Sequence, residues 1–586
     1  MSLNATYRTW LFFATIPILL SACAEFPDYQ WLEAPGWSRA RLIGLTTTRH
    51  QAQPALSSDG KAYFLLVESV DGGSSPQLVA LDQNAQPLFQ ETLPFFSQER
   101  IEDPRVALVN DHLIAFWVES EVLYGIPVGL DGHALGDVQL YSGSRFVDTY
   151  DIALNPNGQL NLWFSGPRSQ PGLYFFDDND GITGVDREGY NPQIEVDDQG
   201  GLHAIWLHNV PGESEHQIFY AYYPDGKFAA SMENHIHSTN VSTSSGLNGP
   251  ILGLDETTVY LFWSVVTRAG PSAGAVQASY TWLPYGGDAE LVAPDQRFRF
   301  PDGYYLNYRA VPSEILAGER AIIADQIHPL VSRLGDLSTN TGSLTEMVVA
   351  FRVRLPYLRN KEATQTGVAF LDDRQVQSVQ LLSFTPSESI LPSIQTDGKG
   401  YVYASWLEGA QPGPYRVYFA GTSPQLIGIL NRLTIQDYLQ ISAEMGFGLL
   451  SGMVLIPFPL AWGLIPALFI LFTGRFRREN ETFNARGTLI TIGLAFIMYW
   501  VSKVITLSGI TTYVPFSAWL PFIPKAWELP LRIGVPLITT LLALYVAWHT
   551  TYRRERNVPL FFILMFIVVD GLISISIYGV IFYNAV

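Results

Sequence analysis

The chain has 586 residues, of which 48% are hydrophobic and 15% are charged, and its formal net charge is −19. This length allows one large domain with its own core and a second module. The charge is unevenly divided: the segment from Gln425 to the end carries 11 Lys/Arg and 7 Asp/Glu, which leaves −23 for the part before it. Because phosphate backbones attract Lys and Arg, this acidic part predicts that nucleic acid is not a partner.

The first 23 residues have the form of a secretory signal peptide, in which one basic residue, Arg8, precedes an apolar run from Trp10 to Leu20. The run ends in Leu-Ser-Ala-Cys, and this Cys23 is the only cysteine of the chain. The ending resembles the lipobox of bacterial lipoproteins, in which the cysteine becomes the lipidated first residue of the mature chain. The alternatives are cleavage without lipidation and an uncleaved anchor. All three would export the chain that follows.

A tether over residues 24–49 leads to a repeated unit. Its clearest copies are Pro192 to Trp206, PQIEVDDQGGLHAIW, and Pro392 to Trp406, PSIQTDGKGYVYASW, which share the proline, the first aspartate, the glycine and the tryptophan at identical offsets. In each copy an apolar run meets an Asp/Gly turn, and a second alternating run follows, which predicts a β-hairpin. More strand-like sequence and a second turn follow the tryptophan, so we expect about four short strands per repeat.

Looser copies of the unit occur at regular intervals between residues 50 and 423. Trp117, Trp163 and Trp206 are spaced 46 and 43 residues apart, within the period of roughly 40 to 50 residues that is typical of propeller blades. Six copies are recognisable, and the interval from Trp263 to Trp406 is long enough to contain another. We therefore predict an all-β propeller of six or seven four-stranded blades. The repeated tryptophans are predicted to be structural blade-core residues, namely Trp117, Trp163, Trp206, Trp263 and Trp406.

One interval departs from the period. The segment from Pro301 to Val376 predicts a helix around Pro312 to Asp336, then a polar stretch, and then a strand pair around Met347 to Arg354 and Gly367 to Leu371. We interpret it as a blade that carries an insertion, since long insertions in a compact domain are either functional loops or tolerated surface excursions.

Short fragments of the repeat, Asp198-x-Gly200 and Ser58-Asp59-Gly60, resemble the Asp-box turn of sialidase-type propellers. From Gln51 to Gly421 the plan is similar to that of bacterial cell-surface propeller lipoproteins, at the level of the repeat only. The resemblance implies a propeller displayed outside the cytoplasm. A sialidase would also need three arginines on the axis and a Tyr/Glu pair. The spacing does not single out three from the arginines of the repeats, Arg105, Arg145, Arg187, Arg297, Arg299 and Arg309.

Patterns for cofactors and metals are weak. The acidic turn from Asp177 to Gly181 lacks the spacing of a calcium loop. His235 and His237 share a strand face with Glu233, but a further ligand is not in view. The motifs of phosphate-binding loops, dinucleotide sites, zinc proteases and serine hydrolases are not recognisable. We expect no cofactor and no metal site.

The period changes after the repeats. Residues 424–445 predict an amphipathic helix that lies in a membrane interface, docks the propeller or serves as a plain rigid linker. Four apolar segments then make up a predicted transmembrane domain over residues 446–586, each near the length of about 20 residues that a bilayer requires. They span residues 446–473, 488–510, 531–548 and 558–583.

Charged residues between the apolar segments predict their orientation. The loops after the first and third segments are rich in arginine, whereas the loop after the second has a single lysine. Under the positive-inside rule the arginine-rich loops are cytoplasmic. The propeller would then lie on the extracytoplasmic side of a bacterial cytoplasmic membrane, which is where the leader would send it.

Two ionisable residues fall within the apolar segments. At the usual helical rise, Asp570 lies about 18 Å along the fourth segment and Lys503 about 22 Å along the second, and both segments run outward. An intramembrane ion pair between Lys503 and Asp570 is therefore feasible. Such a pair could be a proton or ion relay, or it could hold two helices together.

These features predict a membrane-anchored binding, sensing or assembly module whose propeller faces an extracytoplasmic protein or glycan, because loops from several blades converge on one axis. Catalytic residues are not identifiable, so we favour a binding protein over an enzyme. Two alternatives remain open at this point. One is a surface glycan hydrolase, and the other is an accessory subunit of a membrane transport or relay complex.

Overall fold

The computed structural model describes most of the chain from Gly36 onward. The described residues are 36–298, 327–330, 347–443, 459–476, 486–506, 527–553 and 559–578, except 71, 168, 178–180, 211–214, 227, 230–232, 243, 256, 270–275, 359–360, 384, 386, 398, 410–412, 433, 436 and 440–441. The predicted signal peptide, with Cys23, lies outside them, as does most of the acidic turn before Gly181.

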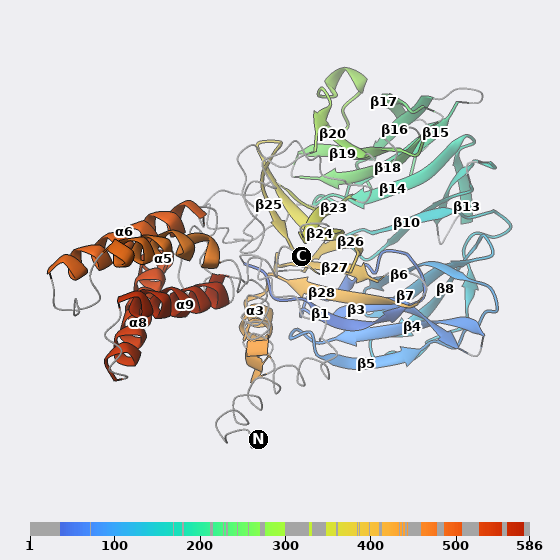
Figure 1. Ribbon diagram of the computed structural model, residues 1–586. Helices are drawn as coiled ribbons and strands as arrows, with labels where there is room; N and C mark the ends of the chain where they lie inside the picture. The colour runs from blue at the N-terminus through green and yellow to red at the C-terminus, as the bar shows by residue number, and fades with distance from the viewer. Residues whose placement is uncertain are drawn as a thin grey trace.

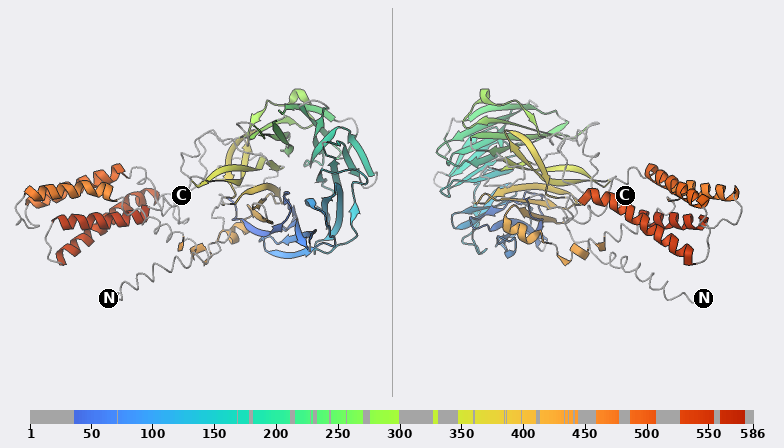
Figure 2. Two further views of the ribbon diagram at one scale, coloured as in Figure 1. Left: turned by 45° about the vertical axis from the view of Figure 1, so that its right-hand side comes forward. Right: turned by 90° about the vertical axis from the view of Figure 1, so that its left-hand side faces the viewer.

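The described residues form seven four-stranded antiparallel sheets, which are arranged as the blades of a propeller around one axis (Figure 1) (Figure 2). The first blade contains β2 (Ala55–Leu56), β3 (Ala62–Val70), β4 (Gly73–Leu81) and β5 (Pro87–Thr92), and the second contains β6 (Ile101–Val109), β7 (His112–Glu119), β8 (Val122–Gly129) and β9 (Gln139–Leu140). The third blade contains β10 (Thr149–Leu154), β11 (Leu160–Ser165), β12 (Leu173–Asp177) and β13 (Gly181–Asp186). The fourth contains β14 (Gly189–Val196), β15 (Leu202–Asn209), β16 (Glu215–Tyr223) and β17 (Glu233–Asn240).

The remaining three blades follow the same plan. The fifth blade contains β18 (Ser245–Leu254), β19 (Thr258–Thr267), β20 (Val276–Pro284) and β21 (Gln296–Arg297), with a 3₁₀ turn at Ala289–Leu291. The sixth contains β22 (Ile327–Leu330), β23 (Met347–Leu358), β24 (Lys361–Asp372) and β25 (Gln375–Leu381). The seventh contains β26 (Ser389–Thr396), β27 (Val402–Glu408) and β28 (Tyr415–Gly421), joined by β1 (Arg41–Thr46). The prediction of a propeller with repeated four-stranded blades is confirmed, and the blade number is seven.

The turn of the repeat has the same structure in its two clearest copies. In the fourth blade the Asp197 carboxylate accepts hydrogen bonds from the backbone N–H groups of Gln199 and Gly201, both at 2.8 Å. In the seventh blade Asp397 accepts from the equivalent N–H groups at 2.9 and 3.0 Å. Such side-chain-to-backbone bonds close a turn between two strands. The aspartates of the repeat therefore stabilise hairpins.

The sixth blade occupies the irregular interval. Its first strand, β22, pairs with β23 from Ile327 opposite Phe351 to Leu330 opposite Val348. The helix predicted around Pro312 to Asp336 is therefore wrong at Ile327–Leu330. The local sequence did not show that an apolar partner strand was available, and pairing of this kind overrides local propensity.

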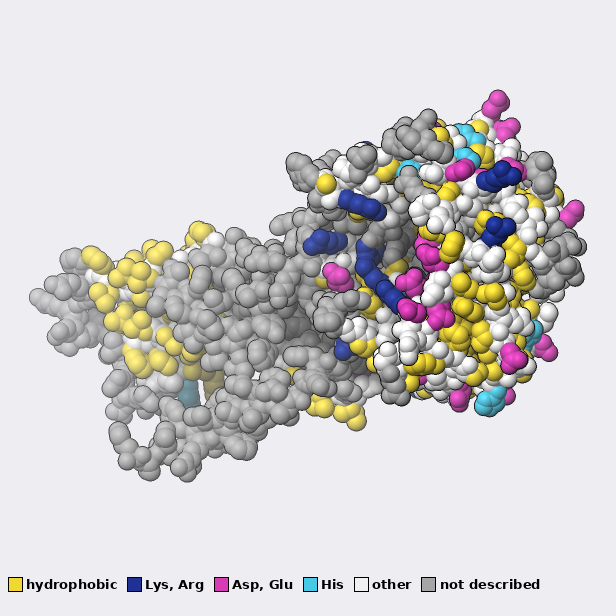
Figure 3. Space-filling view, turned by 90° about the vertical axis from the view of Figure 1, so that its right-hand side faces the viewer, with side chains coloured by type: hydrophobic (Ala, Val, Ile, Leu, Met, Phe, Trp, Pro, Cys, Tyr) yellow, Lys and Arg dark blue, Asp and Glu magenta, His cyan; other side chains and the backbone are white. Residues whose placement is uncertain are grey.

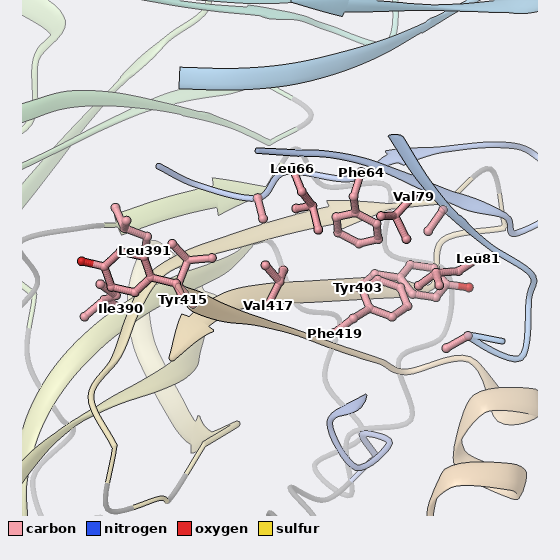
Figure 4. Packing of buried hydrophobic residues seen from close by; sticks show 14 of the residues in the cluster. Phe64, Leu66, Val79, Leu81, Ile390, Leu391, Tyr403, Tyr415, Val417 and Phe419 are labelled. Atoms are coloured by element: carbon pink, nitrogen blue, oxygen red, sulfur yellow. The ribbon is translucent and has the colours of Figure 1, made fainter. Parts of the chain in front are cut away.

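The apolar core lies between the blades, not at the axis. Seven buried clusters each join one blade to the next, so the packing runs around the whole ring. The cluster between the first and seventh blades contains Phe64 and Leu66 against Val417 and Phe419 (Figure 4). Each blade thus stabilises two neighbours, which makes closure of the ring the step that buries the last interface.

The ring is closed by the first strand of the chain. Strand β1 pairs antiparallel with β28, with Arg41 opposite Phe419 and Thr46 opposite Tyr415, and so completes the seventh blade. Part of the segment predicted as a tether over residues 24–49 is therefore a blade strand. The paired residues are between 369 (Thr46 and Tyr415) and 378 (Arg41 and Phe419) positions apart in sequence, so the pairing exists only once the ring has formed.

Helices follow the propeller and form a separate group beside it (Figure 1) (Figure 2). Helix α3 (Pro424–Leu430) ends at Asn431, and helical residues resume at Ile435, so the linker predicted as one helix over residues 424–445 is interrupted. The long helices are α5 (Pro459–Phe476), α6 (Arg486–Thr506), α8 (Glu528–Arg553) and α9 (Pro559–Tyr578), which overlap the four predicted apolar segments. Among the described residues, one helical segment, Leu529–Thr551, is long and apolar enough to cross a membrane, as judged by length and composition alone. Three shorter helical segments, Trp462–Thr473, Gly487–Lys503 and Leu560–Ile575, are also apolar.

Candidate functional site

Four blades have the same distortion in their innermost strand. Backbone φ is positive at Asp103, Asn191, Gly249 and Leu391, with values of 43°, 54°, 96° and 54°, and a proline follows each of these residues. The strand register shifts at the same points. A β-bulge of this kind redirects the side chains that follow it. The proline of the repeat therefore marks a bulge beside the axis.

The inner strands enclose a polar pocket on the propeller axis. Its lining comes from the segment before β2 and from β6, β10, β14, β18 and β26, which together represent six of the seven blades. Four glutamines and three ionisable residues line it, namely Gln51, Gln53, Gln193, Gln395, Arg105, Asp151 and Glu195. Figure 3 shows one face of the propeller, on which basic and acidic side chains gather around a hollow.

Arg105 is the centre of the charged part of this pocket. Its Nη1 donates to Asp151 Oδ1 at 2.6 Å, and its Nε and Nη2 donate to the two oxygens of Asp103, both at 3.1 Å. The guanidinium also lies over the ring of Tyr150, 4.9 Å from its centroid. Burial opposes the charge of Arg105, but Asp103 and Asp151 outweigh this effect and raise its pKa above the ordinary value. Arg105 is therefore held as a fixed cation between two anions.

Asp151 connects three blades. While Oδ1 accepts from Arg105 in the second blade, Oδ2 accepts from the backbone N–H of Ile194 in the fourth, at 2.8 Å. Burial raises the pKa of Asp151, and the charge of Arg105 offsets part of that rise. Both oxygens have donors, as is usual for a buried carboxylate. We infer that this carboxylate positions the inner strands around the pocket.

Glu195 follows Ile194 on β14, the inner strand of the fourth blade. Burial raises the pKa of its carboxyl to about 8, and the negative charge of Asp151 adds to the rise. The residue is partly buried and lines the axial pocket. Ion-pair partners of Glu195 are absent among the described residues. At neutral pH this group is mainly a neutral carboxylic acid, which can donate as well as accept a hydrogen bond.

His50 adds a second neutral group near the charged cluster. Its Nδ1 lies 3.9 Å from Asp103 Oδ1. Burial lowers the pKa of His50, and Asp103 opposes that effect. Glutamines, a protonated carboxyl and a neutral imidazole can all donate and accept hydrogen bonds. The arrangement suits recognition of a polar ligand by several convergent hydrogen bonds.

The five predicted tryptophans lie away from this pocket. All are in the second strand of a blade and are at most 3% exposed, and they pack in the clusters between blades. The Trp206 indole N–H donates to Asp186 at 2.9 Å, and His208 contacts the same carboxylate at 2.8 Å. The placement of these side chains is that of structural residues.

The weak metal pattern does not converge. His235 Nε2 contacts the His237 carbonyl at 3.1 Å, and His237 Nε2 lies 3.8 Å from Asp295. Groups of three or more His, Cys, Asp or Glu side chains suited to a metal ion are not found in the described part of the chain.

A second polar cluster lies inside the helical group. Lys503 Nζ on α6 donates to Asp570 Oδ2 on α9 at 2.5 Å and to Ser574 Oγ at 2.9 Å. The Tyr499 hydroxyl donates to the same carboxylate oxygen, and the Thr540 hydroxyl on α8 lies 3.4 Å from the other. On α5, the indole N–H of Trp462 donates to the Tyr499 oxygen at 3.2 Å. This network therefore connects all four long helices, and the predicted pair of Lys503 and Asp570 forms its centre.

Sequence reasoning missed most members of both clusters. In the helices, Tyr499 and Ser574 lie four residues from Lys503 and Asp570 respectively, so helical spacing alone would have placed them on the same faces. In the propeller, Asp151 and Glu195 stand in the first, otherwise apolar run of their repeats. A charged residue at that position points to the axis once a propeller is assumed.

The chain matches no known protein-family model and no curated protein. Among solved structures it is similar to the polysaccharide lyase Uly1, at 9% identity and a TM-score of 0.42, over 68% of this chain and 92% of that one. It is also similar to a Dyadobacter fermentans protein of unknown function, at 13% identity and a TM-score of 0.36, over 66% and 99% of the two chains. A Penicillium chrysogenum α-L-arabinanase matches at 12% identity and a TM-score of 0.30, over 45% and 79%. At these identities the similarities concern the fold and not the site.

Proposed function

We propose that this chain is a membrane-anchored binding module whose propeller recognises a polar ligand, presented by an extracytoplasmic protein or glycan, at its axial pocket. The observation that carries the proposal is the convergence of polar residues from five blades on one pocket, four of them through their inner strands and the first through the segment before β2. A ligand there would meet Gln193, Gln395 and Glu195 from two sides of the ring. Few, convergent polar groups of this kind give orientation and specificity in binding sites.

Glycan hydrolysis is supported less well. A glycosidase needs one carboxylic acid and one available carboxylate that acts as nucleophile or base. Glu195 fits the first role because its pKa is raised to about 8. The carboxylate next to it is occupied, because Asp151 accepts hydrogen bonds from Arg105 and from the backbone N–H of Ile194. The pocket thus offers an acid without a free partner carboxylate among the described residues, and binding accounts for it better than hydrolysis.

Placement of the helices in a lipid bilayer is supported by their polarity. Their buried side chains include Lys503, Asp570, Ser574 and Thr540. Their exposed side chains are large and apolar on every helix, for example Leu464, Leu468 and Phe472 on α5, Leu489, Ile490 and Ile497 on α6, Ile533, Ile538 and Leu541 on α8, and Leu564, Val568 and Leu572 on α9. The interior is otherwise apolar, so the helices have an apolar exterior as well as an apolar core that encloses a few polar groups. A water-soluble protein would not present so many exposed apolar side chains on every helix. Hydrocarbon is the solvent in which this arrangement is stable.

Export by the leader and the arginine-rich loops support an extracytoplasmic propeller. Protease added to intact spheroplasts should therefore digest the propeller and spare the arginine-rich loops. Digestion of the loops with an intact propeller would show the opposite orientation and would remove the extracytoplasmic part of the proposal.

The binding part is tested with the full chain in lipid nanodiscs, applied to an array of bacterial surface glycans and to a set of extracytoplasmic protein fractions. The Gln193→Ala/Gln395→Ala variant should lose at least tenfold in affinity for any ligand that the wild type retains. Gln375→Ala, on the exposed outer strand β25, is the matched control and should bind normally. Equal binding by all three proteins would exclude the axial pocket, and turnover of fluorogenic glycosides by the wild type would favour the hydrolase.

A further inference from the structure

An apolar face is exposed where the chain leaves the propeller. We use the name exit helix for the described helical residues that follow Thr434, which are 435, 437–439 and 442–443. Within it the exposed fractions of Ile435, Tyr438 and Leu439 are 80%, 51% and 64%. The Tyr438 N–H donates to the Thr434 carbonyl at 3.2 Å, as in a helix. Three neighbouring large side chains with this exposure are unusual on a surface that meets only water.

The opposite face of the exit helix is fixed to the propeller. Asp437 is fully buried, and its Oδ2 lies 3.4 Å from the guanidinium of Arg39. Just before the helix, Asn431 accepts from the Arg39 backbone N–H at 2.7 Å and donates to the Trp37 carbonyl at 3.0 Å. The Ser38 N–H in turn donates to the Gly421 carbonyl at the end of β28, at 2.8 Å. The exit helix is therefore tied to the seventh blade through residues 37–39.

Helical periodicity separates the two faces. At about 100° per residue, Ile435, Tyr438 and Leu439 fall within an arc of about 100°, and Asp437 points away from the middle of that arc by about 150°. The side that docks the propeller and the side that is exposed are thus nearly opposite. The helix has one apolar face with nothing from the described part of this chain covering it.

We propose that the exposed face of Ile435, Tyr438 and Leu439 lies in the outer membrane–water interface and sets the orientation of the propeller on the bilayer. The inference rests on the proposed embedding of α5, α6, α8 and α9. It is carried by continuity, because α5 begins at Pro459, a short stretch after the exit helix, and because its exposed side chains are also apolar. Tyrosine and an adjacent exposed arginine, Arg432, are residue types that favour the lipid headgroup region.

The consequence is a rigid connection between bilayer and propeller. The face in the interface and the Arg39–Asp437 contact are on one short helix, and Asn431 and Ser38 extend the contacts to β28. A flexible linker would let the propeller rotate freely. A helix held on both faces keeps the blade ring, and with it the axial pocket, at one angle to the membrane.

The test uses the full chain with Cys23→Ser, which leaves no cysteine, in nanodiscs that contain one copy each. Single cysteines at Ile435 and Leu439 carry an environment-sensitive fluorophore, and spin-labelled lipids serve as quenchers. Ile538→Cys on α8, 64% exposed, reports embedding, and Leu135→Cys in the second blade, 62% exposed, is the aqueous control. We expect blue-shifted, lipid-quenched emission at Ile435, Leu439 and Ile538 and water-like emission at Leu135.

Each outcome is decisive. Water-like emission at Ile435 and Leu439 with lipid-like emission at Ile538 would overturn the interfacial placement and leave the membrane domain intact. Water-like emission at all positions would show that the helices are not embedded. An apolar environment at Ile435 that appears only in discs with two copies would assign the face to a second copy of the chain and overturn the proposal. With spin labels at positions 435 and 135, Arg39→Gln should broaden the distribution of distances between the two labels. An unchanged distribution would contradict a rigid connection.

Discussion

Arg105 in the second blade and Asp151 in the third form an ion pair across the blade boundary, with 2.6 Å between Nη1 and Oδ1. The same guanidinium holds both oxygens of Asp103 in its own blade. Asp151 reaches on to the backbone of Ile194 in the fourth blade. One cation thus links three inner strands beside the polar pocket on the axis of the ring.

Replacement of Arg105 should destabilise the propeller. The side chains of Arg105 and Asp151 are 20% and 13% exposed, so Arg105→Ala would leave two nearly buried carboxylates without their cation. We expect a loss of about 2–4 kcal/mol in the free energy of unfolding, somewhat below the value for a fully buried pair. Denaturant unfolding of the full chain in detergent, followed by tryptophan fluorescence, measures it.

The exposed Arg145, which lies over the Tyr174 ring, provides the control. Arg145→Ala should change the free energy of unfolding by no more than about 0.5 kcal/mol, as for most surface substitutions. Equal effects of the two replacements would show that Arg105 has no special role in holding the strands together.

Glu195 should make stability depend on pH. Its pKa is about 8 in the folded protein and near the ordinary value of 4.5 when unfolded. The folded state therefore holds the additional proton between these values, so the contribution of this group to stability is full below pH 4.5 and is lost as the pH rises through 8. Glu195→Gln, which resembles the protonated form, should be relatively more stable than the wild type as the pH increases from 5 to 9.

The melting temperature of both proteins across this pH range measures the effect. Other buried groups, including His50 and Asp151, titrate in both proteins, so the difference between the two curves isolates Glu195. Glu91→Gln, on the exposed strand β5, should leave the curve unchanged. Parallel curves for wild type and Glu195→Gln would contradict the raised pKa.

Much of the propeller was accessible from the sequence because its structure is local. The Asp/Gly turns that close each hairpin and the tryptophan of the second strand lie within about 15 residues of each other. The turn at Asp197 and its copy at Asp397 form the same hydrogen bonds. What was missed depends on distant partners. β1 and β22 become strands because β28 and β23 offer them hydrogen bonds and apolar faces.

The axial pocket was not predictable for a similar reason. Arg105, Asp151 and Glu195 come from three repeats, and only the ring places them together. The proline of the repeat was visible, but its role in a bulge follows from the positive φ of Asp103 and Asn191 before it. In the helices the pair of Lys503 and Asp570 was predictable, because charge is rare in apolar segments and helical rise gives the depth. Its hydroxyl partners carry no charge and stood out less.

The two neighbouring tryptophans of the third and fourth blades should respond differently to loss of the indole N–H. Trp163 and Trp206 have centroids 6.1 Å apart and are both fully buried. Trp206 donates to Asp186, whereas Trp163 Nε1 has no hydrogen-bond partner among the described residues. Trp206→Phe should therefore lower the free energy of unfolding by about 1–3 kcal/mol more than Trp163→Phe, because it removes one hydrogen-bond donor from the Asp186 carboxylate.

Thermal and denaturant unfolding of the two variants give this difference. The same large-to-small change is made in the same interface between blades, so most of the packing loss cancels. In a second pair of variants, Trp206→Ala and Trp163→Ala, the free energy of unfolding should fall by about 3–5 kcal/mol in each, because each change leaves a cavity. If Trp163→Phe proves the more harmful of the two phenylalanine variants, the bond to Asp186 does not contribute to stability.

The network around Asp570 predicts how the helical group responds to charge removal. Lys503 is 4% exposed and Asp570 is fully buried, so Asp570→Leu leaves an ammonium without its anion, and Lys503→Met leaves a carboxylate without its cation. Each single variant should destabilise the helices by about 3–5 kcal/mol, and Lys503→Met/Asp570→Leu should recover most of that loss. Unfolding of the full chain by titration with a denaturing detergent, followed by helix content, measures these values.

The double variant also separates a structural pair from a relay. Donors from Lys503, Tyr499 and Thr540 converge on Asp570, so the described network closes on itself within the four helices. A closed network holds helices together, whereas a relay needs further groups that lead toward both surfaces. Retention of stability and of ligand binding by the double variant is the expected result. A stable double variant that loses a proton or ion flux shown by the wild type in proteoliposomes would establish a relay instead. Ile538→Leu, on the exposed face of α8, is the control and should change neither the stability nor the flux.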